Sequence, residues 1–481
     1  MRAIFSTALL LFFSLGSFAN PVQDVSRLAS EEISKLFKVT SEADILSALE
    51  YARAHDQQVV IAGTRHSQGG HILYPDAVML DMTAYNQVIN VDPTDKTVRV
   101  QAGATWAQVQ QAINPHRLAV AVMQSSNIFS VGGTLSANAH GRDTQLGPII
   151  DTVVDIKVAL ASGKIVSASP QQNARLFYAI IGGYGALGVI LEAKLQLVDN
   201  LMLEKTVTAV DYQSYIAHLK DSADTLALHY GRCSIARNQD FLEECFSIDY
   251  VPTDAPASNA ALQEEQHITR NAILFDLSRS SPYGKALRWQ LQQSLMDRTD
   301  RTVTLSRNNA MRPPIHFLDY YSETDTDILQ EYFVPLDQFP AFMHAMKAIL
   351  LEHQVNLLSV TLRYLKQNND NLLPYGQHDS IAIVLYINMG LEPAAIEHAQ
   401  NWTRALVDSA QAHNGSYYLA YQRFPSLAQF QRSYPGWTEF AQVKQQYDPT
   451  GLFNNLFYSH YIGQPWAAEL ARDSNTARRA P

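Results

Sequence analysis

The stretch Ala62-Gly63-Thr64-Arg65-His66-Ser67-Gln68-Gly69 points most directly to the fold of this chain. It follows the apolar run Val59-Val60-Ile61, which predicts a short buried strand. A turn of small residues after a strand leaves main-chain N–H groups open to a diphosphate, because few side chains block the approach. The octet therefore predicts a cofactor-binding loop with His66 beside the ligand. The alternative is a solvated loop histidine.

Length and composition indicate a globular protein with more than one core. The 481 residues exceed one ordinary domain, so two domains or one large composite are expected. A hydrophobic content of 47% provides for a sizeable interior. The formal net charge of −10, without a run of Lys or Arg, argues against a nucleic-acid partner.

The first residues have the pattern of an export signal. Arg2 precedes an apolar run over 8–13, and Ser17-Phe18-Ala19 supplies the small residues that a signal peptidase requires. This run is too short to span a bilayer, and later segments lack the necessary apolar length, so no stable membrane insertion is expected. We predict a signal peptide over residues 1–19 and a periplasmic or secreted protein.

The two cysteines, Cys233 and Cys245, suit an exported protein. Disulfides persist in oxidising compartments, so an even count favours a bridge between them. The alternative is a pair of buried thiols.

Short strands and helices are mixed along the rest of the chain. Ser41 and the apolar residues after it predict a capped helix. The other expected elements of the first part are strands over 59–62, 77–81, 98–104, 152–160, 165–166 and 188–197, and a helix over 105–113. From about Leu201, strands over 202–210, 330–335 and 381–388 are expected to alternate with helices over 212–220 and 339–354. This mixture predicts an α+β protein with mixed sheets rather than alternating parallel β-α-β units.

Two further glycine-rich segments complete a recognisable pattern. Residues 131–141 read Val-Gly-Gly-Thr-Leu-Ser-Ala-Asn-Ala-His-Gly, and residues 182–190 contain Gly-Gly-Tyr-Gly followed by Gly-Val-Ile. In this order and spacing, residues 38–198 resemble the FAD-binding half of the vanillyl-alcohol oxidase superfamily, also called the p-cresol methylhydroxylase (PCMH) type. The resemblance implies a two-subdomain PCMH-type domain. Its first loop would wrap the pyrophosphate, its second would line the flavin, and its last strand would hold the adenine and ribose.

The resemblance continues into the second half. Residues 331–335 (Glu-Tyr-Phe-Val-Pro) resemble the start of the family's substrate-cap sheet, and residues 447–454 resemble the C-terminal return to the flavin domain. Within the superfamily, the chain is similar to cytokinin dehydrogenases, decaprenylphosphoryl-ribose oxidase-like proteins and sugar-lactone oxidases.

These features define the expected domain organisation. The FAD-binding domain covers 38–198, and a substrate-binding cap domain with an antiparallel sheet flanked by helices covers 199–435. The return covers 436–465. The charged, alanine-rich composition of residues 466–481 predicts a disordered tail.

The resemblance implies FAD as the cofactor, held by both loops, the last strand and the return. The implied cofactor-binding residues are Ala62, Gly63, Thr64, Arg65, His66, Ser67, Gln68, Ser125, Gly132, Gly133, Ser136, His140, Ile190 and Asn454. His66 matches the position where many relatives attach FAD through its 8α carbon, which requires an imidazole nitrogen. The alternative is an unlinked, hydrogen-bonding histidine. Residues 123–130 contain no cysteine, so only a single attachment is expected.

The implied catalytic residues are Arg363, Tyr421 and Arg423. Arg363 would stabilise negative charge near the flavin, with Arg423 or Lys366 as alternatives for this role. Tyr421 replaces a lysine found in ribose-oxidase relatives, and it would orient a substrate hydroxyl or accept its proton if its pKa is lowered. Ser125 stands where cytokinin dehydrogenases carry an aspartate that takes a proton from an amine, which weighs against amine oxidation.

These residues predict an FAD-dependent oxidoreductase, an oxidase or a dehydrogenase. It would remove a hydride from a CH–OH group of a sugar, polyol, lactone or related small alcohol, with oxygen or another molecule as electron acceptor. Neither a metal nor a nicotinamide cofactor is expected. The alternatives are a cytokinin-type dehydrogenase acting on a C–N bond and a non-catalytic secreted flavin-binding protein.

Overall fold

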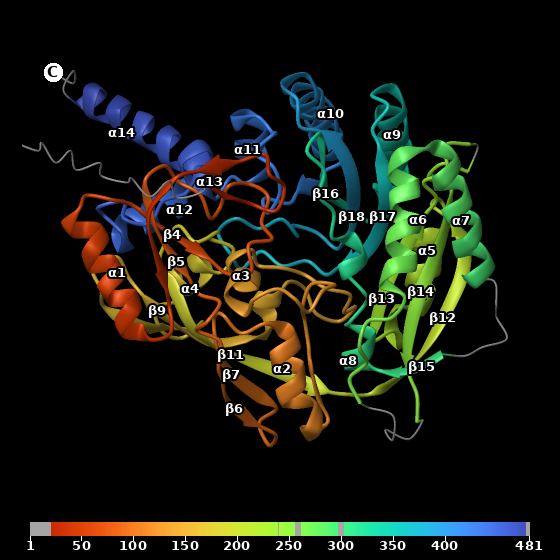
Figure 1. Cartoon of the computed structure of the whole chain (residues 1–481), viewed down its shortest axis with the longest axis horizontal. Helices are drawn as coiled ribbons and strands as arrows, with labels where there is room; N and C mark the ends of the chain where they lie inside the picture. Colours follow the sequence, from red (N-terminus) through yellow and green to blue (C-terminus); the bar gives the residue numbers. More distant parts are fainter. Residues whose placement is uncertain (1–20, 239, 255–260, 297–302, 478–481) are drawn as a thin grey trace, which may run out of the picture.

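The structure, a computed structural model, describes residues 21–238, 240–254, 261–296 and 303–477. Two halves lie side by side (Figure 1). The first half ends with strand β11 (Val189–Asp199), and the second begins with β12 (Met202–Asp211), which belongs to a different sheet. The chain then returns to the first half after the second sheet is complete. The predicted signal peptide lies outside the described residues.

A three-stranded parallel sheet carries the first loop. Its order is β3-β5-β4, formed by β3 (Ile33–Lys38), β4 (Val59–Ala62) and β5 (Ala77–Asp81), with helix α1 (Glu42–Ala54) between β3 and β4. The capped helix is confirmed, because Ser41 and Asp44 form a reciprocal capping box. The parallel β3-α1-β4 crossover was not expected. A short apolar run such as 59–62 fits either kind of pairing, so its partner is decided by tertiary packing.

The second sheet of the first half has six strands, all paired antiparallel. The order is β10-β9-β11-β7-β6, with β8 beside β11. Its other strands are β6 (Val88–Asp92), β7 (Thr97–Gln101), β8 (Leu118–Val120), β9 (Val153–Ala159) and β10 (Ile165–Ala168). The helices of this region are α2 (Trp106–Ile113), α3 (Val131–Ser136) and α4 (Ala174–Ile180). The predicted hairpin of 152–160 with 165–166 is present as β9 and β10.

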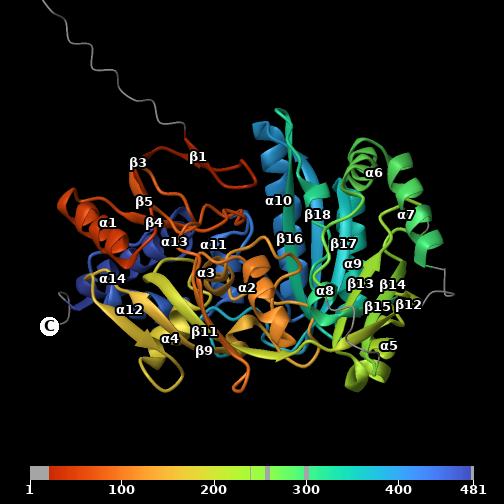
Figure 2. The same ribbon diagram turned by 60° about the horizontal axis from the view of Figure 1, so that its bottom comes forward.

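An eight-stranded antiparallel sheet forms the second half, in the order β15-β12-β14-β13-β17-β18-β16-β19. Its remaining strands are β13 (Leu228–Cys233), β14 (Glu244–Pro252), β15 (Val303–Ser306), β16 (Asp325–Pro335), β17 (Leu357–Leu365), β18 (Ser380–Gly390) and β19 (Ser416–Tyr417). Figure 2 shows β16 close to the first half and β12 far from it. The predicted disulfide is confirmed, since Cys233 and Cys245 are cross-strand partners in β13 and β14 and are bonded.

Helices cover both faces of this sheet. One face packs against α5 (Tyr215–Ser222), α9 (Phe339–Glu352) and α10 (Pro393–Ala412). The other face meets α6 (Ile268–Ser280) and α7 (Pro282–Met296). Ring contacts identify the two faces: Tyr332 packs on Phe342 of α9, whereas Tyr386 packs on Phe275 of α6. The α+β class, with an antiparallel cap sheet flanked by helices, is confirmed.

The C-terminal return packs beside β4. Its helices are α11 (Leu427–Ser433), α12 (Trp437–Tyr447), α13 (Leu456–Tyr458) and α14 (Gln464–Ala477). Asp448 forms a buried ion pair with Lys444 and accepts the N–H groups of Leu452 and Phe453. Leu452 in turn accepts the N–H of Val59 at 2.7 Å. These contacts fix the return against the strand that leads into the first loop.

The prediction of a disordered tail from residue 466 is wrong as far as Ala477, because α14 occupies this segment. Its alanines, Leu470 and Glu469 are strong helix formers, and that preference outweighed the charged composition used to predict disorder. In Figure 1, α14 extends from the body of the molecule at the upper left. None of the helices in the described ranges is long and apolar enough to cross a membrane.

Candidate cofactor and active site

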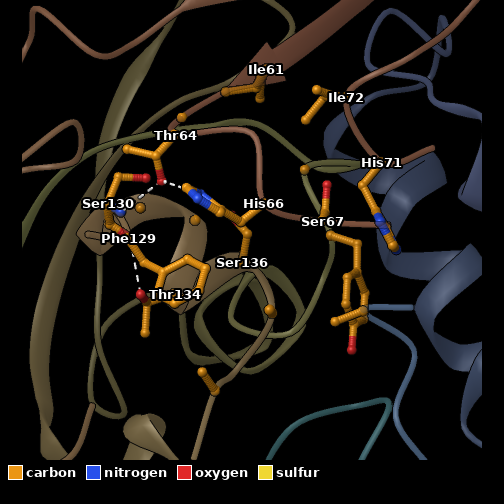
Figure 3. A pocket seen from close by; sticks show the side chains of 18 of the residues that line it. Ile61, Thr64, His66, Ser67, His71, Ile72, Phe129, Ser130, Thr134 and Ser136 are labelled. Carbon is orange, nitrogen blue, oxygen red and sulfur yellow. Dashed lines mark hydrogen bonds between the residues drawn. The ribbon is translucent and has the colours of Figure 1, made fainter. Parts of the chain in front are cut away.

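A cavity of about 1200 Å³, counting the part open to solvent, lies where the first half meets the cap sheet. Its wall contains much of the predicted set: Gly63, Thr64, Arg65, His66, Ser67, Gly132, Gly133, Ser136, Ile190 and Tyr421. The structure thus brings together the two loops, the last strand of the first half and the segment 418–421 that follows β19. Figure 3 shows side chains of the two loops in the cavity wall.

The first loop, residues 63–69, turns sharply after β4. Arg65 adopts a left-handed backbone with φ of 61°, and its side chain pairs with Asp81 at 3.2 Å. The backbone N–H groups of residues 64–67 have no hydrogen-bond partner among the described residues. Free N–H groups at a turn beside a cavity suit a diphosphate, as the sequence predicts.

His66 lies in the cavity wall with its ring held from two sides. Its Nδ1 is 3.2 Å from Thr64 Oγ1, and the ring edge packs on Phe129 with centroids 4.7 Å apart (Figure 3). Burial lowers the pKa of His66, although the distant Asp319 opposes this effect. The imidazole is therefore neutral at neutral pH, and a neutral ring nitrogen retains the lone pair that a nucleophile needs.

The second glycine-rich segment packs on the end of β7. Gly132 donates its N–H to Ala102 O at 2.7 Å. A Cβ at Gly132 would lie 2.8 Å from Ala102 Cβ and 3.0 Å from Ala102 O, so glycine permits this approach. Thr134, in the same helix α3, accepts the indole N–H of Trp106 at 2.9 Å. The backbone of α3 is therefore fixed close to the cavity.

Sequence reasoning missed His71, which also lines the cavity. Its Nε2–H donates to Leu419 O at 3.0 Å, and its ring stacks on Tyr184. Burial lowers the pKa of His71 to about 3, so the ring is neutral. The available signal in the sequence was that His71 is the second histidine of the stretch GTRHSQGGH, five residues after His66.

Two buried polar atoms of the wall are available to bind a ligand. His71 Nδ1 and Ser67 Oγ have no hydrogen-bond partner among the described residues. Buried polar groups in native proteins are nearly always satisfied, so such atoms in a cavity wall indicate a polar ligand. Gly185, also in the wall, has φ of 76° and open space where a Cβ would be. These features fit FAD, and the residues that would hold it belong to the two loops and to β11.

A buried carboxylate lies behind the cap-side wall of the cavity. Glu331 in β16 accepts Nε2–H of His140 at 2.6 Å on one oxygen and the hydroxyl of Tyr421 at 3.0 Å on the other. Burial favours the protonated acid, but His140, Arg363 and Tyr421 together hold the pKa of Glu331 below its usual range. Glu331 is therefore ionised at neutral pH. In the sequence, Glu331 stands out only as part of the cap motif, because its partners lie 191 and 90 residues away.

The structure corrects one expected role of Tyr421. Burial and the neighbouring Glu331 raise its pKa well above the ordinary value. Proton acceptance through a lowered pKa is therefore wrong, since the phenol stays neutral. Its orienting role fits, because the side chain lines the cavity and donates to Glu331.

The remaining predicted residues lie behind or beside the wall. They are Ala62, Gln68, Ser125, His140, Asn454, Arg363 and Arg423. Ala62 and Asn454 make backbone contacts at β4, and Arg423 donates to Leu456 O at 3.3 Å. Ala62, Gln68 and Asn454 therefore support the first loop through strand pairing, the cap and the return, whereas Ser125 Oγ and Arg363 Nε are buried without a hydrogen-bond partner among the described residues.

Three of these residues connect the cavity wall to the cap. Gln68 accepts from the Leu329 N–H at 2.9 Å and from the Gln422 side chain at 2.8 Å. His140 is 2% exposed and reaches Glu331 instead of the cavity. Arg363 projects from β17 on the sheet face that carries Glu331, since their partners in β18 are two residues apart and therefore point to the same face. Within the described parts of the chain, no group of His, Cys, Asp or Glu is arranged to hold a metal.

Comparisons with known proteins match both halves. A family model described as an FAD binding domain matches residues 33–169, and one described as D-arabinono-1,4-lactone oxidase matches residues 321–461. L-gulonolactone oxidase from Mus musculus is 24% identical over 428 residues, covering 88% of this chain and 93% of the relative. Cytokinin dehydrogenase 10 from Oryza sativa subsp. japonica is 30% identical over 172 residues, covering 34% of this chain and 31% of the relative.

The fold also resembles a solved structure. Cholesterol oxidase from Brevibacterium sterolicum superposes with a TM-score of 0.69 at 13% identity, covering 92% of this chain and 97% of that one. At this identity, the likeness shows a shared fold along nearly the whole chain.

Replacing Gly132 by alanine should reduce flavin content. The added Cβ pushes against the backbone of Ala102, and overpacking of this kind costs about 1–3 kcal/mol, or about tenfold or more in affinity. The absorbance ratio of flavin to protein in the purified variant measures the effect. Gly376→Ala is the control, since Gly376 does not line the cavity and its nearest atom would be Leu365 Cδ2 at 3.0 Å, the end of a side chain that can shift. Equal flavin content in both variants would contradict the assignment of this segment to the flavin wall.

The two family models cover separate halves, and the full-length relative and the solved structure follow the same order of parts. The cavity lies between those halves and has the free N–H groups and buried polar atoms that FAD requires. The chain therefore belongs to the vanillyl-alcohol oxidase/PCMH superfamily and is an FAD-dependent oxidoreductase.

Proposed function

We propose that this protein oxidises a CH–OH carbon of a sugar lactone or of a closely related sugar or polyol. The observation that carries the proposal is the hydrogen-bonded pair of Tyr421 and Glu331 at the cap side of the cavity. This pair provides a route for the hydroxyl proton. The match to the D-arabinono-1,4-lactone oxidase model supports the substrate class, because residues 321–461 contain both side chains. L-gulonolactone oxidase and L-galactono-1,4-lactone dehydrogenase are among the relatives.

The proton moves through the two side chains in sequence. A substrate hydroxyl that hydrogen-bonds to Tyr421 Oη passes its proton to that oxygen while the phenol's own proton moves to Glu331 Oε2. Tyr421 is neutral before and after the transfer, as its raised pKa requires. Glu331 is ionised beforehand, as its lowered pKa requires. His140 holds the other carboxylate oxygen in place through its Nε2–H.

The reaction balances with one acceptor for electrons and one for the proton. When bound, FAD supplies the acceptor for the hydride that leaves the CH–OH carbon. The O–H proton reaches Glu331, and the substrate becomes a carbonyl compound. Oxygen or another molecule would serve as the final acceptor of the two electrons, and oxygen consumption during turnover distinguishes these alternatives.

Glu331→Gln should lower kcat by about 10²–10⁴-fold, the usual contribution of a general base. In the wild type, kcat should fall as the pH is lowered through the pKa of Glu331; in the variant this acid limb should disappear. Stopped-flow bleaching of the flavin under anaerobic conditions measures both effects. Glu352→Gln, which changes an exposed carboxylate at the end of α9, is the matched control. An unchanged acid limb in Glu331→Gln would rule out this base.

Amine oxidation of the cytokinin type is less well supported. Ser125 is in the position expected for the aspartate that would act on an amine, and its buried hydroxyl is not a base. The similarity to cytokinin dehydrogenase 10 also covers only a third of this chain. Anaerobic bleaching of the flavin by alcohols and not by amines would support oxidation of a CH–OH carbon. Bleaching by neither would favour a flavin-binding protein without turnover.

We also propose that His66 is bonded covalently to the 8α carbon of FAD. Its neutral, buried ring at the cavity wall supports this, because Nδ1 lies against Thr64 and Nε2 has no partner among the described residues. The link would form one C–N bond at the expense of one C–H bond of the methyl group and the N–H bond of the imidazole; the two protons would leave to water, and the acceptor that reoxidises the flavin would take the two electrons.

The covalent link is tested by acid precipitation followed by intact-mass measurement. Wild-type protein should keep its yellow colour and carry the mass of FAD, whereas His66→Ala should release all flavin into the supernatant. His55→Ala, which alters an exposed histidine at the end of α1, should behave like the wild type. Complete release of flavin from the wild type would reject the linkage.

We propose export with cleavage after Ala19. The apolar run over 8–13 and the small residues 17–19 motivate this, and the Cys233–Cys245 disulfide supports it, because disulfides persist outside the reducing cytoplasm. The protein recovered from the native host should begin at Asn20 and lie in the extracytoplasmic fraction. A cytoplasmic protein that retains residues 1–19 would overturn the proposal.

A further inference from the structure

One face of the cap sheet carries an unusual group of cations, here named the cationic face: Arg142, Arg232, Lys285, Arg288 and Arg363. Strand register places two of them with Glu331. Arg232 is the cross-strand partner of Thr361, and the same row of cross-strand partners continues through β18 to Glu331. Arg363 lies two residues further along β17, so it projects from the same face. The cationic face therefore adjoins the carboxylate and tyrosine of the proposed active site.

The other three cations reach this face from neighbouring elements. Arg142, two residues after His140, places its guanidinium 4.1 Å from the ring centroid of Tyr230. Arg288 of α7 donates to Leu358 O at 2.8 Å, and Lys285 donates to Asn356 Oδ1 at 2.6 Å. These partners are neutral.

Ring packing shows that α7 covers the face from which Arg232 projects. Phe246, the cross-strand partner of Arg232, packs on Trp289 of α7 with ring centroids 5.3 Å apart. The residues of α7 and of β13 therefore face one another.

The cationic face has more cations than matching anions among the described residues; the charge of Glu331 acts on Arg363. None of its five members takes part in a salt bridge with another described residue, and Glu331 is already bonded to His140 and Tyr421. Burial and the neighbouring cations lower the pKa of Lys285 to about 7 and that of Arg288 to about 9. The Nε atoms of Arg142 and Arg363 are buried with no hydrogen-bond partner among the described residues.

Such an arrangement is costly without a ligand. Cations removed from water lose hydration, and only an opposite charge or hydrogen bonds compensate for that loss. The whole chain carries a net charge of −10, so this cluster does not follow from composition. Guanidinium groups bind carboxylates and phosphates through paired N–H donors.

We infer that the substrate carries an anionic group, a carboxylate or a phosphate, which Arg232, Arg363 and Arg142 hold while its CH–OH group meets Tyr421 and Glu331. This inference rests on the proposed function and narrows the substrate to a sugar lactone, sugar or polyol that also carries a carboxylate or a phosphate.

The first test measures binding to the purified holoenzyme without turnover. D-gluconate, D-glucitol 6-phosphate and neutral D-glucitol share a carbon chain and differ in charge, and inorganic phosphate is the minimal anion. Titration calorimetry should show that at least one anion binds about tenfold or more tightly than D-glucitol, as expected for one charge-assisted bidentate contact. Tighter binding of D-gluconate identifies a carboxylate, and tighter binding of the phosphates identifies a phosphate.

Arg232→Gln should remove this preference, and Arg232→Lys should retain part of it because the charge remains. Arg432→Gln alters an arginine whose side chain is 57% exposed and should leave the preference unchanged. In anaerobic flavin bleaching, Arg232→Gln should raise KM for the anionic compound about tenfold while KM for D-glucitol stays constant.

Two outcomes separate the two proposals. If no anion binds more tightly than D-glucitol, or if Arg232→Gln changes all ligands equally, the anionic substrate is rejected. If anions bind through Arg232 but no CH–OH compound reduces the flavin, the anion site stands and the proposed oxidation fails.

Discussion

The ionised carboxylate of Glu331, buried between His140 and Tyr421, is the interaction on which the site depends. His140 belongs to the first half, Glu331 to the cap sheet and Tyr421 to the loop after β19, so one charge is satisfied by three separate parts of the chain. A buried carboxylate with one partner removed is strongly destabilising. The halves are therefore held in one arrangement at the point where hydroxyl chemistry needs a base.

The first loop is fixed by the same segment that carries Tyr421. Gln68 donates its backbone N–H to Ala420 O and accepts hydrogen bonds from both β16 and Gln422 through its side chain. The residues next to it keep their N–H groups free toward the cavity. Rigid support on one side and open donors on the other are what a bound dinucleotide needs, because a loop that must reorganise on binding loses affinity.

The cap sheet separates two functions on its two faces. The face toward α9 and α10 is aromatic and apolar, as in the packing of Tyr332 on Phe342, and it contributes stability. The opposite face carries Glu331 and the cationic face, whose charges are poorly matched within the chain. Charges that a fold leaves uncompensated are best explained by a ligand. The cationic face therefore links the choice of substrate to the cap. The buried carboxylate of Glu331 joins the cap to the first half of the chain.

The sequence by itself determined the local pieces: the glycine loop with His66, the capped helix after Ser41, the hairpin of β9 and β10, and the order of parts that resembles an FAD-dependent family. These depend on neighbours within a few residues, where spacing and turn chemistry are decisive. Tertiary structure alone decided that β3, β4 and β5 run parallel, that His71 stacks in the cavity wall, and that Tyr421 keeps its proton. It also brought Glu331 to His140 across 191 residues of chain. Burial and long-range charge set these properties, and neither is encoded in a local pattern.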